Sequence, residues 1–74
     1  MSKRVIDERC KSIGQNIRRY REEKGWTQEE LAEKTSVHVS YIGQIERGLR
    51  YPSLKVLFRI ADVLMIEVEG IFKS

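Results

Sequence analysis

The chain has 74 residues, which is room for one domain over residues 1–74, and its hydrophobic fraction of 41% excludes global disorder. Its net charge is +3, and its one cysteine, Cys10, cannot form an intramolecular disulfide. The N-terminus lacks an apolar targeting segment, and no apolar run approaches the roughly 18 residues of a membrane span. We therefore expect a cytoplasmic protein with no membrane partner.

The first helix is predicted from apolar residues that recur at steps of three and four, namely Ile6, Cys10, Ile13, Ile17 and Tyr20. Lys24 followed by Gly25 is typical of a helix end. The start is open, because Asp7 or Ser12 could be the N-cap. Residues 1–11 are therefore an uncertain extension that could be helix, arm or a frayed end.

The second helix has the clearest local signal in the chain. The segment Thr27–Glu30 fits a capping box, in which the Thr27 hydroxyl accepts from the backbone N–H of Glu30 and the Glu30 carboxylate accepts from that of Thr27. The helix is short and is predicted to run to about Lys34.

A third helix is predicted over 38–47, after a turn at 35–37 that contains no glycine, and it ends at Gly48. Two short helices joined by three or four residues, the first strongly capped and the second ended by glycine, describe a helix-turn-helix.

After a loop at 49–52, Ser53 is the natural N-cap of a fourth helix over 54–64. A short helical turn over about 67–72 closes the chain. No segment alternates for long enough to predict a strand, so we expect an all-α protein.

The sequence resembles the phage-repressor/Cro-like helix-turn-helix family, also called the XRE family, over roughly residues 13–72. The matching segments are IRRYR at 17–21, GWTQEELA at 25–32, Val37, YIGQIERG at 41–48, and Pro52, Ser53, Leu57, Ile60, Ala61 and Leu64. Within this family the short chain is similar to controller proteins of restriction–modification systems and to small prophage repressors. The resemblance implies an all-α, five-helix bundle of the phage-repressor type, with the helix-turn-helix in helices 2 and 3.

Two residues depart from the family pattern. Met65 stands where the family usually has a glycine after the fourth helix, which leaves the exit from that helix open. Gly43 lies inside the third helix, where glycine costs about 1 kcal/mol relative to alanine. Either a DNA backbone or another helix approaches Gly43 closely, or the glycine is exposed and tolerated.

The resemblance implies that the third helix, 38–47, lies in the major groove of double-stranded DNA. With Ile42 and Ile45 facing the core, the outer residues near the start of the helix can reach base edges. The predicted base-reading residues are Val39, Ser40 and Gln44, with Tyr41 and His38 as secondary candidates. Tyr41 could equally be half core, and His38 could be a plain surface residue at the helix start.

Phosphate contacts are expected at the N-terminus of the second helix, where free N–H groups and the helix dipole attract an anion. Thr27 and Gln28 lie there, and the resemblance implies that Gln28 holds a phosphate. The other predicted phosphate contacts, around the loop after the third helix, are Arg47, Arg50, Tyr51 and Lys55. Arg18 and Arg19 are read as a solvated face.

Glu46 is the only acidic residue between Lys34 and Arg59, a stretch that contains five basic residues. An acid facing DNA would repel phosphate, so Glu46 is expected to turn inward to a cation. The resemblance implies that this cation is Arg21, in a structural ion pair.

The C-terminal third is predicted to join two copies in a symmetric dimer. A core-facing set of Leu54, Leu57, Ile60, Ala61 and Leu64 is sufficient for the fourth helix, which leaves Val56 and further apolar residues as a surplus. The predicted dimer interface is Phe58, Val63, Met65, Ile66, Val68, Ile71 and Phe72. The alternative is that the last helix folds back and covers the whole set.

An enzyme is not expected, because one His and one Cys leave no acid–base pair, metal site or phosphate-binding glycine loop. We expect no cofactor, metal or small-molecule ligand. The sequence predicts a DNA-binding transcriptional regulator that acts as a homodimer on a near-palindromic operator. The alternative is a protein-interaction module on the same fold, such as the antitoxin of a toxin–antitoxin pair.

Overall fold

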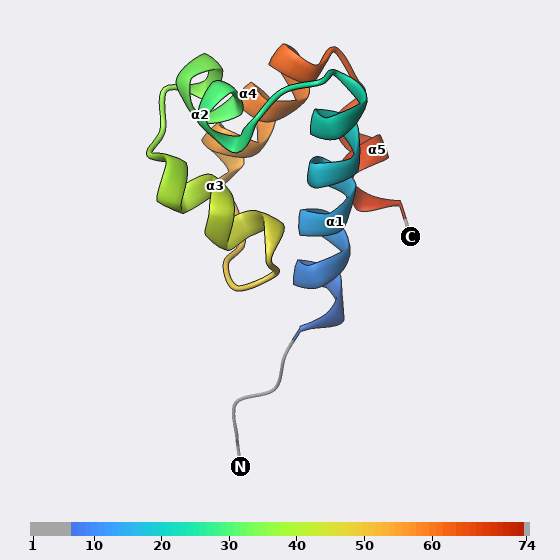
Figure 1. The fold of residues 1–74 in the computed structure, drawn as a ribbon. Helices are drawn as coiled ribbons and strands as arrows, with labels where there is room; N and C mark the ends of the chain where they lie inside the picture. Colours follow the sequence, from blue (N-terminus) through green and yellow to red (C-terminus); the bar gives the residue numbers. More distant parts are fainter. Residues whose placement is uncertain (1–6, 74) are drawn as a thin grey trace.

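The structure, a computed structural model, describes residues 7–73, and this part of the chain contains five helices and no strand. In chain order the helices are α1 (Glu8–Glu23), α2 (Gln28–Thr35), α3 (Val39–Glu46), α4 (Leu54–Leu64) and α5 (Val68–Phe72) (Figure 1). The all-α expectation is confirmed. Each of these helices is too short or too polar to cross a membrane.

The structure shows which of the two candidate residues, Asp7 or Ser12, is the N-cap of α1. The Asp7 carboxylate accepts a hydrogen bond from the backbone N–H of Arg9 at 2.9 Å, so Asp7 is the cap and Ser12 lies inside the helix. Ile6, which the sequence pattern assigned to the first helix, lies outside the described residues. Gly25 follows the helix end with φ +77°, a conformation that glycine adopts without strain.

The capping box of α2 is present as predicted. The Thr27 hydroxyl accepts from the backbone N–H of Glu30 at 3.1 Å, and the Glu30 carboxylate accepts from that of Thr27 at 2.8 Å. The glycine-free turn after α2 is made by Ser36, which takes the left-handed conformation at φ 62°.

Met65 ends α4 in the same left-handed conformation, at φ 59°. Its backbone N–H donates to the carbonyl oxygens of Ala61 and Asp62, so the exit from α4 has the usual geometry although no glycine is present. For a residue with a side chain this conformation costs about 1–2 kcal/mol.

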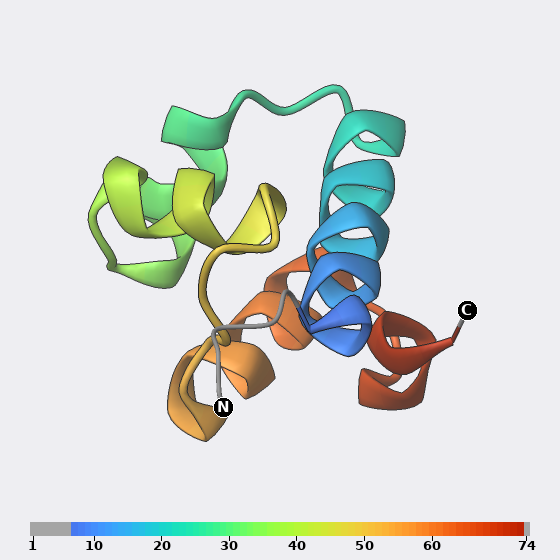
Figure 2. The same ribbon diagram turned by 90° about the horizontal axis from the view of Figure 1, so that it is seen from below.

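The core lies where α1 packs between α3 on one side and α5 on the other (Figures 1 and 2). Its fully buried side chains come from all five helices, and the largest are Ile17, Leu31, Ile42, Ile45, Ile60, Leu64 and Ile71. Cys10 is also buried, and burial raises the pKa of its thiol, which keeps the thiol protonated.

The fold of α5 corrects part of the predicted dimer interface. Ile71 is 0% exposed and Val56 is buried, so neither belongs to an apolar surplus that one copy leaves uncovered. Val63, Ile66 and Val68 are half-buried against the core. The reason is that α5 folds back along α1, so that one copy covers most of the set by itself.

Three residues of the predicted dimer interface remain exposed. Phe58, Met65 and Phe72 are 53%, 78% and 52% exposed. Leu54, which was assigned to the core, is 71% exposed because it lies in the first turn of α4, outside the packed face. The apolar surface that remains is therefore smaller than predicted and lies on α4 and the end of α5.

Asn16 holds the last helix against the first. Its buried side-chain amide donates to the backbone carbonyl oxygen of Ile71 at 2.8 Å and also to that of Lys73. Its carbonyl oxygen accepts from Arg19 at 3.0 Å, so both ends of the amide are used. Nothing in the sequence pattern singled out this residue.

Candidate nucleic-acid interface

The outer surface of α3 is formed by four of the five residues predicted to read bases. His38 is the N-cap, has no side-chain capping bond and is exposed, as are Val39 and Ser40 in the first turn. Gln44 lies one turn after Ser40 on the same side and is half-buried. Small, apolar and amide side chains are therefore displayed together on a helix with its other side in the core.

Tyr41, the fifth candidate, has a structural position. It is half-buried against the core, and its hydroxyl accepts a hydrogen bond from the backbone N–H of Ser53 at 2.9 Å. The guanidinium carbon of Arg50 lies 4.8 Å from the centre of its ring. Tyr41 thus supports the loop between α3 and α4 from the side of the core.

Arg50 also touches the outer surface of α3 directly. Its Nη1 donates a hydrogen bond to the Oε1 atom of Gln44 at 3.4 Å. This contact could not be predicted from the sequence, because the two residues are six positions apart and are separated by a loop whose path follows no periodic pattern.

The predicted ion pair between Arg21 and Glu46 is confirmed. Arg21 Nε lies 2.7 Å from Oε2 of Glu46 and Nη2 lies 3.0 Å from Oε1, so the contact is bidentate, and both residues are buried. Arg21 Nη1 also donates to the carbonyl oxygen of Trp26 at 2.6 Å. The hydrogen bonds to Glu46 raise the pKa of Arg21 above its usual range.

The side chain of Gln28 joins this network. Its Nε2 donates to Oε1 of Glu46 at 3.0 Å, which directs the amide toward the end of α3. At the start of α2 the N–H groups of Thr27 and Glu30 serve the capping box. Among residues 7–73, the N–H groups of Gln28 and Glu29 have no acceptor, so these two are the donors that α2 offers to an anion.

Gly43 is buried, so the interpretation that it is an exposed, tolerated glycine is wrong. The atoms nearest to a Cβ at this position are Oε1 of Gln28 at 3.7 Å and Nη1 of Arg47 at 3.9 Å. These are ordinary contacts with side chains, and within the described part no backbone of another helix approaches this position.

Tyr51, a predicted phosphate contact, is engaged elsewhere. Its hydroxyl donates a hydrogen bond to the carboxylate of Asp7, which ties the loop to the start of α1. This bond lowers the pKa of Asp7, to which the N–H of Arg9 also donates, and it raises the pKa of Tyr51.

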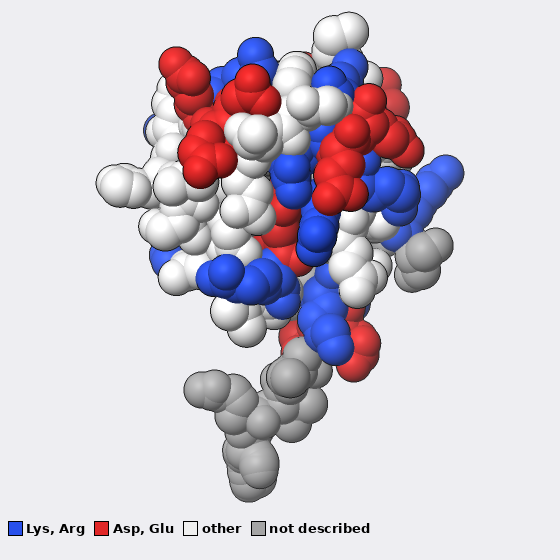
Figure 3. All heavy atoms as spheres, in the orientation of Figure 1, with Lys and Arg blue, Asp and Glu red and all other residues white. Residues whose placement is uncertain are grey.

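The remaining basic candidates, Arg47, Arg50 and Lys55, are exposed at the end of α3, in the loop and at the start of α4. In Figure 3 the acidic side chains lie mainly in the upper half of the face shown, whereas its lower left part carries basic side chains. A positive region therefore lies near the end of α3.

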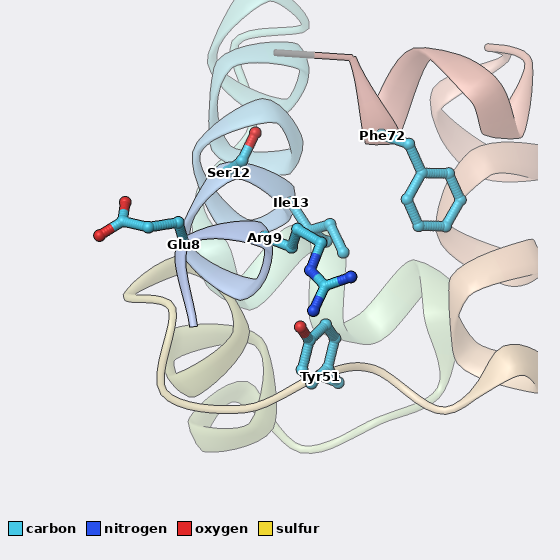
Figure 4. Close-up of a pocket in the computed structure, with 6 residues that line it drawn as sticks. All are labelled: Glu8, Arg9, Ser12, Ile13, Tyr51 and Phe72. Carbon is cyan, nitrogen blue, oxygen red and sulfur yellow. The ribbon is translucent and has the colours of Figure 1, made fainter. Parts of the chain in front are cut away.

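A hollow of about 450 Å³ lies at the start of α1, away from the outer surface of α3 (Figure 4). Ile13, Tyr51 and Phe72 supply its apolar lining, and the polar residues Glu8, Arg9 and Ser12 complete it. Within residues 7–73 no group of three or more His, Cys, Asp or Glu side chains could hold a metal ion.

A sequence model of the family described as helix-turn-helix matches residues 17–71 of the chain. Among curated proteins, the chain is 47% identical over 63 residues to the HTH-type transcriptional regulator SinR of Bacillus licheniformis. The match covers 84% of this chain and 57% of that protein, so the chain spans little more than half the length of this relative.

Solved structures of several other proteins are similar in fold, and two serve as examples. The restriction-modification controller protein C.AhdI from Aeromonas hydrophila has a TM-score of 0.85 and 36% identity, and the match covers 89% of this chain and 100% of that one. SinR, described as the master regulator for biofilm formation and solved in complex with DNA, has a TM-score of 0.78 and 44% identity, with coverage of 82% and 98%.

Proposed function

Since the chain belongs to the helix-turn-helix family of the phage-repressor (XRE) type, we propose that it is a sequence-specific, DNA-binding transcriptional regulator of the cytoplasm. The observation that carries the proposal is the outer surface of α3. His38, Val39, Ser40 and Gln44 are displayed there on a short helix that is fixed to the core behind them. A helix fits the major groove, where such side chains discriminate base pairs.

The start of α2 would hold the protein on the DNA backbone. The N–H groups of Gln28 and Glu29 are free of acceptors within residues 7–73, and they lie at the positive end of the helix dipole. Arg47 at the end of α3 and Lys55 at the start of α4 add positive charge. These groups bind phosphate whatever the sequence, so they contribute affinity and orientation, while α3 supplies the discrimination.

Selection of bound duplexes from a random DNA pool tests the proposal. We expect enrichment of one short motif, with binding that weakens steeply as salt is raised because phosphate contacts release counterions. A matched variant, Gln44→Ala, should alter the enriched motif. Recovery of no motif from the pool, or equal binding to all duplexes, would contradict the proposed function.

We also propose that the working unit is a two-fold dimer joined through α4 and the end of α5. Leu54, Phe58 and Met65 lie on one stripe of α4, and together with Phe72 they expose a large apolar area on a small domain. A two-fold dimer would present two copies of α3 to half-sites about 34–36 Å apart, so the operator is expected to be a near-palindrome.

Sedimentation at micromolar concentration tests the dimer. We expect the wild type to sediment as a dimer and Phe58→Asp and Phe72→Asp to sediment as folded monomers. Ile71→Asp is unsuitable for this test, because Ile71 is in the core and its loss would unfold the domain. A wild-type monomer whose DNA binding shows no cooperativity between half-sites would contradict the dimer.

A further inference from the structure

Arg50 contacts two residues of α3, the half-buried Tyr41 and the outer residue Gln44. Its guanidinium lies over the ring of Tyr41, with 4.8 Å between the guanidinium carbon and the ring centre. Its Nη1 donates to Oε1 of Gln44 at 3.4 Å. A cation over an aromatic face is an attractive contact, and the planar guanidinium suits both interactions at once. The side chain of Arg50 therefore bridges a supporting residue and a base-reading candidate.

The loop that carries Arg50 is fixed on both sides of this residue. Before it, the backbone N–H of Leu49 donates to the carbonyl oxygen of Gln44 at 2.9 Å; after it, Tyr51 donates a hydrogen bond to Asp7 at the start of α1. Ser53 donates its backbone N–H to the Tyr41 hydroxyl at 2.9 Å and is also the N-cap of α4. The backbone of Arg50 is therefore held in a defined position relative to α3. A side chain that only moved freely in solvent would not require such a fixed backbone.

We propose that Arg50 is a positioning residue for base specificity, which acts through Gln44. A glutamine amide can present its oxygen and nitrogen in either order, and only one order matches adenine, where N6–H donates and N7 accepts. A guanidinium has donors only, so it pairs with Oε1 of Gln44 and not with Nε2. Arg50 therefore fixes the order of the two groups and lowers the entropic cost of ordering Gln44 in the complex.

This inference rests on the proposed function and differs from a simple phosphate contact for Arg50. A phosphate contact would strengthen binding to every duplex and would contribute about one to the slope of log affinity against log salt. A positioning role instead affects the preference at one base pair, the pair that Gln44 reads.

Binding of Arg50→Lys and Arg50→Ala should be measured with the duplex selected by the wild type and with duplexes changed at each base pair. At the base pair affected by Gln44→Ala, both variants are expected to lose about 3- to 10-fold in preference. Arg50→Lys retains the charge, so its salt dependence should stay close to that of the wild type. The double variant Arg50→Ala/Gln44→Ala should lose no more preference than Gln44→Ala alone.

Arg47→Ala is the matched control, because it removes an exposed arginine at the end of the same helix. It should weaken binding to all duplexes alike. The proposal is wrong if both Arg50 variants, shown to be folded by circular dichroism, keep the wild-type preference at every base pair, or if the Arg50 and Gln44 effects simply add. A wild type without any preferred duplex is a different outcome, which contradicts the proposed function and this inference together.

Discussion

Gly14 of α1 lies directly against the backbone carbonyl oxygen of Ile45 in the last turn of α3. A Cβ at Gly14 would overlap this oxygen, and it would also lie 2.9 Å from the carbonyl oxygen of Glu46. Main-chain atoms of a packed helix cannot move aside as the end of a flexible side chain can. The two helices therefore meet at this distance only because residue 14 has no side chain.

Gly14→Ala is expected to lower the free energy of unfolding by about 1–3 kcal/mol, the usual cost of overfilling a packed core. Urea denaturation measures this change. Gly43→Ala is the matched control, since a Cβ there meets only side-chain atoms at 3.7 Å or more. That variant should be as stable as the wild type or more stable by up to about 1 kcal/mol. Equal stability of both variants would contradict the close contact between α1 and α3.

Removal of one partner from the buried ion pair of Arg21 and Glu46 should lower the free energy of unfolding by more than Gly14→Ala does. Arg21→Met or Glu46→Leu leaves a buried charge without its partner, so the loss of stability is expected to be about 3–5 kcal/mol. The double variant Arg21→Met/Glu46→Leu should regain most of this loss. Thermal or urea unfolding provides the measurement. Single-variant losses below about 1 kcal/mol, which are typical of exposed pairs, would show that the pair is not buried in solution.

Loss of a base-reading residue of α3 and loss of a phosphate contact at the start of α2 should affect DNA binding differently. Gln44→Ala and Ser40→Ala are each expected to reduce discrimination at particular base pairs, by about 1–3 kcal/mol for a bidentate contact. Gln28→Pro removes the free backbone N–H at the first position of α2, where proline is tolerated, and should weaken binding to all duplexes nearly alike. Competition binding with single-base changes in the duplex gives the comparison. An unchanged sequence preference in Gln44→Ala would exclude α3 as the helix that reads bases.

The contact between Tyr51 and Asp7 predicts a pH dependence of stability. The Tyr51 hydrogen bond is the main cause that lowers the pKa of Asp7 below its ordinary value of 3.8. Since the carboxylate form is favoured in the folded protein, the stabilisation is complete above pH 3.8 and is lost as the pH falls through the lowered pKa.

Tyr51→Phe isolates this effect from that of other carboxylates. The difference in unfolding free energy between wild type and Tyr51→Phe should be largest near neutral pH and should shrink below pH 3.8. Urea denaturation at a series of pH values measures it. A difference that stays constant with pH would mean that the hydroxyl does not bind the ionised carboxylate.

Met65→Gly should stabilise the protein. The left-handed backbone at φ 59° strains a residue with a side chain, whereas glycine adopts it freely. The expected gain is up to about 1 kcal/mol, because the greater freedom of glycine in the unfolded chain offsets part of the relief. Met65→Ala removes the exposed side chain but keeps the strain, so it should show no such gain at the same protein concentration.

The helices and the outer surface of α3 could be predicted from the sequence because both depend on local rules. The capping box of Thr27 and Glu30 and the N-cap at Ser53 are set by residues within one turn of each other. The side of α3 that faces outward follows from the spacing of Ile42 and Ile45, which are buried. The family resemblance supplied the Arg21–Glu46 pair, which composition alone could not.

What the sequence did not predict depends on contacts between distant segments. Ile71 looked like surface because α5 is too short to show which side is covered, and its burial depends on packing along α1. The hydroxyls of Tyr41 and Tyr51 both serve the loop after α3, because the path of that loop brings Ser53 and Asp7 within their reach. No periodic pattern describes such a path.

The hydrogen bonds from Asn16 to the carbonyl oxygens of Ile71 and Lys73 have a consequence for folding during synthesis on the ribosome. The first helix cannot complete its side of the core until residue 73 has left the exit tunnel, because Ile71 fills that core and Asn16 needs both carbonyl groups. A nascent chain that stops before α5 would expose apolar surface on α1. Folding of this domain therefore follows the translation of its last helix and does not proceed helix by helix during elongation.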